Sequence, residues 1–249
     1  MSYSILISDL HLDARRPEHL HALRQLLDAQ AGQCHALYVL GDLFEAWIGD
    51  DDDDPFYREA INAFRAFAES DSNLYFMHGN RDFLLGTTFE HDTGGTLLEE
   101  GSVHELHGRH VLLMHGDSLC TDDEAHQAFR RQVRDPQWQR EMLAKPLEQR
   151  RMMAQMLRMK SMQNNENKPE NIMDVNADAV VRTMEEAGVR ELIHGHTHRP
   201  AVHNVPLPSG GTGRRWVLGD WGKLGWWIRV GEEELRLESF PLDQAGTPE

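Results

Sequence analysis

The sequence is poor in cysteine, in positive charge and in long apolar runs. Its 249 residues include two cysteines, Cys34 and Cys120, which do not form a metal-type pair, so we expect a protein of the reducing cytosol. Lysine and arginine total 25 against 41 acidic residues, and the net charge of −16 argues against a general duplex-DNA binder. No apolar run approaches the ~18 residues that span a bilayer, and the N-terminus lacks the basic n-region of a signal peptide.

What the sequence does contain is a repeated order of apolar strand, loop and amphipathic helix. We predict strands at 3–8, 36–40, 74–77, 111–114 and 192–193, helices at 18–29, 56–68 and 175–187, and further short strands within 203–240. Continuous apolar strands are typical of a sheet that is covered on both faces. The order of the elements therefore predicts an α/β fold, with helices packed on the faces of a buried sheet.

Polar residues follow these strands, usually beside a glycine. The motifs are Asp9-x-His11, Gly41-Asp42-x-x-Glu45, Gly79-Asn80-Arg81-Asp82, His115-Gly116-Asp117 and Gly195-His196-Thr197-His198. Binding sites in α/β sheets form beyond the carboxyl ends of strands, so we expect these residues to converge. In an extended segment, side chains two residues apart point to the same side, so Asp9 with His11, and His196 with His198, would each offer two ligands to one region.

Together these motifs predict a metal centre. Mixed carboxylate, amide and imidazole ligands suit Mn²⁺, Fe²⁺ or Zn²⁺ rather than a calcium cage or a thiolate zinc site. Seven candidate ligands are too many for one tetrahedral ion but suit two ions that share a carboxylate. Taken singly, the motifs have plainer explanations: Gly-Asp is a common turn, and Gly-Asn-Arg-Asp could be a hairpin turn or a surface ion pair. Their order, each after a strand, favours the metal centre.

The motifs and their order resemble those of the calcineurin-like metallophosphoesterases. The resemblance covers residues 3–120 and 170–240 and implies a sandwich of two sheets flanked by helices, with a dinuclear centre at the strand ends. It implies that one ion is bound by Asp9, His11, Asp42 and His198, and the other by Asp42, Asn80, His115 and His196. Asp42 would bridge the two ions, and Glu45 and Asp117 would orient the ligands.

Arg81 departs from many members of that family, which have a histidine at this position. Arginine stays protonated and is a poor general acid, but it can hold a phosphate and neutralise developing charge. A substrate with a leaving group of low basicity, such as a pyrophosphate or phosphodiester, is therefore favoured over an alkyl monoester. The alternative is that Arg81 is a structural partner of Asp82.

Residues 121–169 interrupt the strand–helix order, and we expect them to form a helical cap inserted into a core of residues 1–120 and 170–249. They read as three helices separated by Pro136 and Pro146. Within 125–168 there are ten basic and four acidic residues, a net charge of +6, and six of the eleven methionines. A basic, methionine-rich segment suits an apolar acyl groove near anionic groups. The alternative to this groove is that the methionines fill a core and the basic residues form a solvated face. We expect the aspartate run 50–54 to be a solvated loop.

A more specific resemblance runs nearly end to end. The segments ALYVLGDLFEAWIGD (36–50), HGNRDFLLG (78–86), MHGDSLCTDD (114–123), IMDVN (172–176) and IHGHTHRP (193–200) are similar to the UDP-2,3-diacylglucosamine hydrolase family of Gram-negative lipid A synthesis. That family implies water attack at the α-phosphorus, which gives UMP and 2,3-diacylglucosamine 1-phosphate. It also implies substrate contacts by Asn80, Arg81, Asp123, Ser161, Asn165, Lys168 and His196. Arg81, Asn80 and His196 would act in catalysis.

The same resemblance implies two Mn²⁺ ions per chain, with Fe²⁺ or Zn²⁺ still open. Its partners would be a lipid-nucleotide substrate and the cytoplasmic face of the inner membrane, where the protein would be peripheral, with no nucleic acid and no obligate protein partner. Two alternatives remain. One is a metallophosphoesterase acting on cyclic nucleotides, phosphoproteins or nucleic acid; the other is a non-catalytic scaffold. Cys120 could look like a nucleophile, but no adjacent base pattern supports that role.

Overall fold

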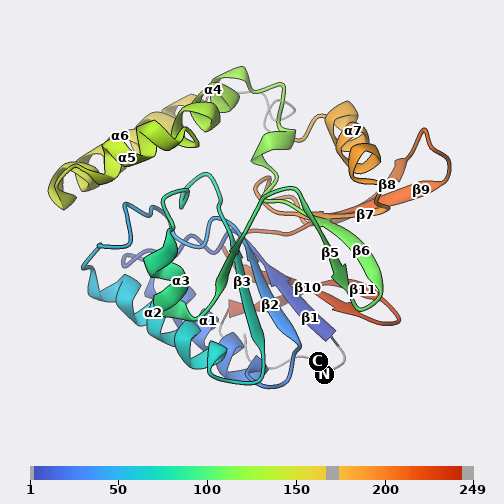
Figure 1. Ribbon diagram of the computed structural model, residues 1–249, viewed down its shortest axis with the longest axis horizontal. Helices are drawn as coiled ribbons and strands as arrows, with labels where there is room; N and C mark the ends of the chain where they lie inside the picture. Colours follow the sequence, from blue (N-terminus) through green and yellow to red (C-terminus); the bar gives the residue numbers. More distant parts are fainter. Residues whose placement is uncertain (1–2, 167–173, 243–249) are drawn as a thin grey trace.

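The computed structural model describes residues 3–166 and 174–242, with the helical backbone alone at 160 and 162–166. Two sheets pack face to face, and helices cover their outer faces (Figure 1). The core accordingly falls into three apolar clusters, one between the sheets and one under each helical layer. The expected α/β sandwich of two sheets flanked by helices is confirmed.

The first sheet has six strands. In spatial order they are β11 (Leu235–Pro241), β10 (Leu224–Gly231), β1 (Tyr3–Ile7), β2 (Ala36–Leu40), β3 (Asn73–Met77) and β4 (Thr96–Leu98). The neighbours from β1 to β4 are parallel, so their carboxyl ends share one edge of the sheet. All five residues of β2 are buried, as expected for a strand covered on both faces.

The second sheet has five strands. In spatial order they are β5 (Ser102–Leu106), β6 (Arg109–Leu113), β7 (Glu191–His194), β9 (Thr212–Val217) and β8 (Ala201–Pro206). The neighbours β6, β7 and β9 are parallel, and the antiparallel strands β5 and β8 lie at the edges. The loops after β6 and β7 therefore leave from the same edge of this sheet.

Local sequence explains where the flanking helices begin and end. The helices are α1 (Pro17–Gln30), α2 (Pro55–Ala68), α3 (Thr87–Thr93) and α7 (Ala177–Ala187). Asp54 caps α2 by accepting from the Phe56 amide, and α7 ends at Gly188, whose φ of 66° closes the helix. The sequence patterns did not indicate α3, because its seven residues contribute only two buried side chains and show no helical period.

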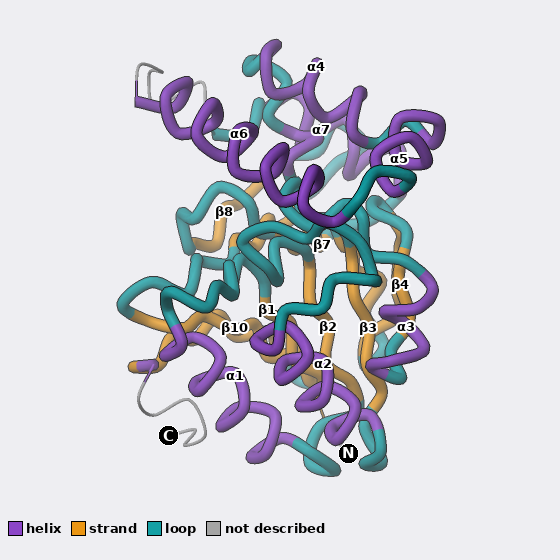
Figure 2. Tube along the Cα trace, turned by 90° about the vertical axis from the view of Figure 1, so that its left-hand side faces the viewer, coloured by secondary structure: helices purple, strands orange, loops and turns teal. Residues whose placement is uncertain are grey.

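Three helices of the inserted segment lie together over the carboxyl-end loops (Figures 1 and 2). They are α4 (Glu124–Val133), α5 (Pro136–Leu143) and α6 (Leu147–Glu166). Pro136 occupies the first turn of α5, where its missing N–H costs nothing. No helix in the described parts of the chain is long and apolar enough to cross a membrane.

The aspartate run 50–54 anchors α6, so the expectation of a simply solvated loop is wrong. The buried guanidinium of Arg150 donates to the Ile48 carbonyl at 2.7 Å and to Asp51 Oδ1 at 2.7 Å. Arg151 pairs with both Asp52 and Asp53. The acidic run neutralises two cations of the basic segment, because charged side chains that leave water need partners.

Candidate active site

Strained backbone marks the loops that carry the predicted ligands. Outside glycine, the described residues have a positive φ at six positions, between 47° and 64°, and five of the six are predicted ligands. The five are Asp9, His11, Asp42, His196 and His198. Left-handed backbone is costly for such residues and concentrates at functional sites. The expectation that these pairs of ligands lie on extended segments is wrong, yet the strained turns still direct both members of each pair toward one region.

Asp9, His11 and His198 form one group that could hold a metal ion, with ligand atoms within 4.8 Å of one another. The Nε2 atoms of His11 and His198 are 3.2 Å apart, and His198 Nε2 lies 3.3 Å from Asp9 Oδ1. Asp9 Oδ1 and His11 Nδ1 are buried without a hydrogen-bond partner. Buried polar atoms without partners are rare, and a cation among these atoms would satisfy the carboxylate.

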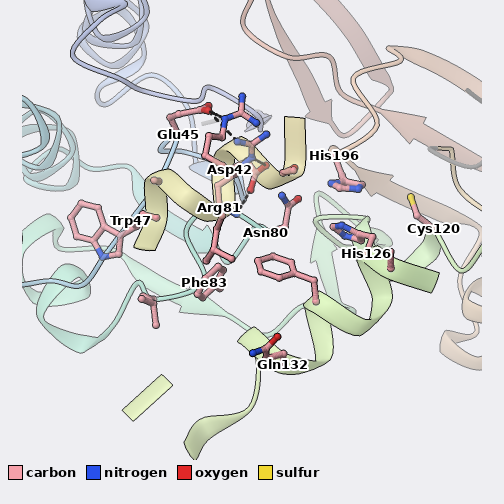
Figure 3. Close-up of a pocket in the computed structure, with 18 of the residues that line it drawn as sticks. Asp42, Glu45, Trp47, Asn80, Arg81, Phe83, Cys120, His126, Gln132 and His196 are labelled. Atoms are coloured by element: carbon pink, nitrogen blue, oxygen red, sulfur yellow. Dashed lines mark hydrogen bonds and ion pairs between the residues drawn. The ribbon is translucent and has the colours of Figure 1, made fainter. Parts of the chain in front are cut away.

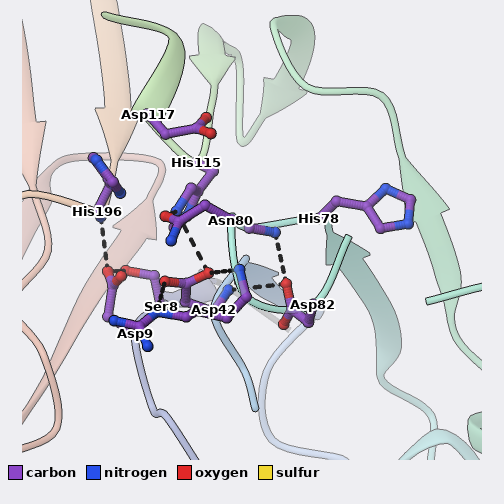
Figure 4. A network of polar contacts seen from close by, with 12 residues as sticks. Ser8, Asp9, Asp42, His78, Asn80, Asp82, His115, Asp117 and His196 are labelled. Carbon is purple, nitrogen blue, oxygen red and sulfur yellow. Dashed lines mark hydrogen bonds and ion pairs between the residues drawn. The ribbon is translucent and has the colours of Figure 1, made fainter. Parts of the chain in front are cut away.

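Asp9, Asp42 and His115 form a second such group (Figure 4). Asp9 is thus common to both groups, whereas the expected bridge is Asp42. His115 Nδ1 lies 2.9 Å from the Leu40 carbonyl, which leaves Nε2 facing Asn80 Oδ1 at 3.0 Å and Asp42 Oδ1 at 3.7 Å. An imidazole whose other nitrogen bonds a backbone carbonyl is the usual arrangement of a metal ligand. The donor set therefore fits a divalent ion.

Burial and charge set the protonation of these groups. Burial lowers the pKa of His11 and of His196 well below the ordinary value, so both imidazoles are neutral and keep a lone pair for a metal. Burial also acts to lower the pKa of His115, but the carboxylates of Asp42 and Asp9 outweigh it and raise the pKa to about 9. Burial raises the pKa of Asp42 to about 7. Cations bound by these groups would therefore displace protons from them.

His196 lies beside the second group rather than within it. Its ring centroid is 5.1 Å from that of His115 and 5.1 Å from that of His126, and its amide donates to Asp9 Oδ2 at 2.9 Å. Asp117 contacts His126 at 3.7 Å and Arg130 at 3.1 Å. The sequence motifs did not indicate His126, which no spacing singles out.

Arg81 pairs with Glu45 rather than with Asp82. Its Nη1 donates to Glu45 Oε1 at 3.0 Å. The buried Asp82 instead accepts from the Gly79 amide at 2.7 Å and the Leu43 amide at 2.7 Å, tying the β2 and β3 loops together. The alternative that Arg81 is a structural partner of Asp82 is therefore wrong. Glu45 Oε2 is also 3.6 Å from His11 Nδ1, which is the position for a group that orients this ligand.

A cavity of about 600 Å³ joins this polar centre to an apolar pocket under the inserted helices (Figure 3). Its polar end is formed by Asp42, Asn80, Arg81, His196 and His198, and Asp123 and Ser161 also line the cavity. Its apolar end is lined by Trp47, Ile48, Phe83, Leu84, Phe129, Trp138, Met142 and Leu157. Of the expected substrate contacts, the side chain of Asn165 and all of Lys168 lie outside the described residues. Cys120 also lines the cavity, and burial raises its thiol pKa to about 12, against a nucleophilic role.

The methionines of the inserted segment are divided between the two sides of the helices. Met142 is buried and lines the cavity. Met152, Met156 and Met159, by contrast, form an exposed stripe on α6. Met153 is partly buried against the core, so Met142 alone of the described methionines lines the expected acyl groove, and the expectation for the three exposed ones is wrong. Helical period puts them on one face, but packing turns that face outward.

Comparisons with known proteins agree with this geometry. Residues 4–200 match the calcineurin-like phosphoesterase family. A protein of Cellvibrio japonicus (strain Ueda107), named UDP-2,3-diacylglucosamine hydrolase, is 48% identical over 96% of this chain and 99% of its own length. A protein of the same name from Escherichia coli O81 (strain ED1a) is 48% identical, with 96% of this chain and 99% of that protein covered.

Proposed function

Because this chain belongs to the calcineurin-like phosphoesterase family, we propose that it is a metal-dependent hydrolase of UDP-2,3-diacylglucosamine, giving UMP and 2,3-diacylglucosamine 1-phosphate in lipid A biosynthesis. One observation carries the choice of substrate: a single cavity joins the candidate metal centre to an apolar pocket. A pyrophosphate can lie at the polar end while acyl chains occupy the other. A cyclic nucleotide or a phosphopeptide would leave the apolar end unused.

Two divalent ions, which we propose to be Mn²⁺, would be held by the predicted ligands. The first would take Asp9, His11, Asp42 and His198, and the second would take Asp42, Asn80, His115 and His196. Bound ions supply a water of lowered pKa and neutralise charge on phosphoryl oxygens. Asp42 groups with Asp9 and His115, and its role as the bridge to the first ion is proposed from the family's ligand pattern.

The chain's own residues would position the phosphates. Arg81 lies at the polar end of the cavity, where its permanently charged guanidinium can hold phosphoryl oxygens while water attacks the α-phosphorus in line. Asn80 and His196 line the same end and would contact the phosphate as well as a metal. The leaving sugar phosphate is weakly basic, so a proton donor at the position of Arg81 is not required.

The helices α4–α6 would act as a lid over the lipid end of the substrate, with residues 121–169 forming the cap and 1–120 and 170–249 the core. Ser161 and Asp123 line the cavity from this segment, and we propose that Asn165 and Lys168 extend the same contacts to the sugar and phosphates. The outward stripe of Met152, Met156 and Met159 and the net basic charge of this segment suit contact with an anionic membrane surface. The protein would thus be peripheral on the cytoplasmic face of the inner membrane.

The test is release of UMP from UDP-2,3-diacylglucosamine by purified protein supplied with Mn²⁺. We expect His11→Ala and Arg81→Ala to lose turnover by roughly 100-fold or more, since the first removes a proposed metal ligand and the second a cation at the reacting phosphate. Parental activity in both variants would exclude the proposed roles. Faster turnover of a cyclic nucleotide than of the lipid nucleotide would favour another phosphoesterase. A protein that binds no transition metal under any loading would be a scaffold.

A further inference from the structure

Glu45 is the shared partner of several cations from different parts of the chain. Arg81 Nη1 from the β3 loop and Arg158 Nε from α6 both contact the same oxygen, Oε1. Arg16, near the start of α1, lies 3.8 Å from Oε2, and His11 Nδ1 lies 3.6 Å from it. The Glu45 side chain is 9% exposed, so these contacts are made largely out of water.

One carboxylate cannot neutralise three guanidiniums, and the cluster keeps an excess of positive charge. Arg81 has one other carboxylate within reach, Asp42 Oδ2 at 3.8 Å, which is itself a candidate metal ligand. Burial and the nearby charge of Arg81 lower the pKa of Arg158. A partly buried cluster with more arginines than Glu45 can neutralise, open to a cavity, is suited to an anion whose oxygens are more numerous than those of Glu45.

Arg158 is directed into the cavity by the helix that carries it. Ala154, Leu157, Arg158 and Ser161 all line the cavity and follow one another at helical spacing, so they form the inner face of α6. Ser161 is a predicted substrate contact one turn away. The helical spacing from Ser161 could have indicated Arg158 in the sequence, but the choice of face needed the structure.

We propose that Arg158 is a substrate-binding residue, contributed by α6, that holds a phosphate of a nucleoside diphosphate-linked substrate. Without substrate, Arg158 and Arg81 pair with Glu45; when a substrate enters the cavity, its phosphate oxygens replace Glu45 as the partners of both guanidiniums. This inference rests on the proposed function for the identity of the substrate, but not for the contact itself.

A purely structural tie between α6 and the core is the competing account of the Arg158–Glu45 pair. Arg150 on the same helix shows what such a tie is like: its side chain is 3% exposed and donates to two backbone carbonyls as well as to Asp51. The Arg158 side chain is 34% exposed and contacts a carboxylate that is already shared with other cations. Arg158 is thus available to an entering anion in a way that Arg150 is not.

The experiment is calorimetric binding of UDP, which has both phosphates but no acyl chains, to the metal-loaded protein. Arg158→Met keeps the apolar stem and removes the charge, and we expect UDP to bind roughly 10–100-fold more weakly, the scale of one charge-assisted hydrogen bond. The Michaelis constant for the lipid nucleotide should rise by a similar factor, with a smaller change in turnover number. Arg158→Lys should recover part of the affinity.

Arg131→Met is the matched control, because Arg131 is an exposed arginine of α4 that does not line the cavity, and its UDP affinity should equal that of the parent. If Arg158→Met bound UDP as tightly as the parent while the Michaelis constant for the lipid nucleotide rose, Arg158 would be a structural tie and the inference would be wrong. UDP binding does not depend on turnover, so a failure of the proposed reaction would be seen separately.

Discussion

Replacement of Gly79 by alanine should disable the metal centre without unfolding the protein. Gly79 lies in the β3 loop, where the added Cβ would fall 2.1 Å from Asp42 Oδ1 and 2.3 Å from the Asp42 backbone nitrogen. Contacts under 3.0 Å are essentially never seen for a real Cβ, so the two loops would have to separate by about 1 Å. The backbone φ of Gly79 lies outside the range that L residues avoid, so the clash alone accounts for the effect.

The expected magnitude follows from that displacement. Overpacking of this kind costs about 1–3 kcal/mol, less than the 5–15 kcal/mol by which folded proteins are usually stable. The variant should therefore remain folded at 25 °C. A catalytic group misplaced by about 1 Å can lose ~100-fold in rate, so we expect turnover of the lipid nucleotide to fall by that order. Binding of Mn²⁺ should weaken roughly 10–100-fold, as for changes to groups that orient metal ligands.

Titration with Mn²⁺ and a turnover assay at saturating metal would measure both effects, with thermal unfolding as the check on folding. The control is Gly108→Ala, in the turn between β5 and β6, where the added Cβ meets nothing within 4 Å. Its φ of +78° makes the substitution cost about 1 kcal/mol in backbone strain without touching a proposed ligand. If Gly79→Ala kept parental metal affinity and turnover within about threefold of the control, the close contact between the two loops would not position Asp42, and the reasoning would fail.

Three further predictions concern the anchor of α6, the apolar pocket and the protonation of the centre. Asp51→Asn leaves the buried Arg150 without a charged partner, although water replaces part of the loss because Asp51 is 62% exposed. The cost should be about 1 kcal/mol, so hydrogen exchange in α6 should accelerate roughly fivefold. Unchanged exchange would argue against the anchor. Ala154→Trp should fill the apolar end of the cavity and raise the Michaelis constant for the lipid nucleotide at least about tenfold, while UDP binds as before. Gln155→Trp, on the exposed side of α6, should change neither the Michaelis constant nor UDP binding. Because the pKa of His115 is raised to about 9, this residue is protonated near pH 7 in the metal-free protein; metal binding should then release a proton, and metal affinity should rise with pH up to about 9. Calorimetry in buffers of different ionisation enthalpy would show the proton, and the absence of any buffer dependence would contradict the prediction.

The elements that position the site could be predicted from the sequence because their patterns are local. The apolar run 36–40 is β2 with the predicted bounds, and the stripe of Ile61, Phe64 and Phe67 is buried in α2. The short helix α3 and the strands β4 and β5 could not be predicted, because each has few buried residues and takes its shape from neighbours in space.

Contacts between distant segments could not be predicted in the same way. The aspartates at 50–54 looked like a solvated loop, since the nearest basic residue in the sequence, Arg58, is a single cation. Arg58 binds backbone carbonyls of the run, and the arginines that pair with its side chains are on α6, about a hundred residues further along the chain. Arg81 stands next to Asp82, yet pairs with Glu45, because the Asp82 carboxylate is already taken by backbone amides. Adjacency in sequence did not indicate adjacency in space for either group.

By itself the sequence determined the kind of chemistry: which side chains follow the strands, that their oxygen and imidazole atoms suit divalent metals, and that a basic, methionine-bearing helical segment is inserted in an acidic core. Residue type and helical period do not depend on how the chain packs. Only the tertiary structure decided which way the side chains of α6 point. It turned Met152, Met156 and Met159 outward and Arg158 inward on α6, because a helix has several faces and burial against the core selects one.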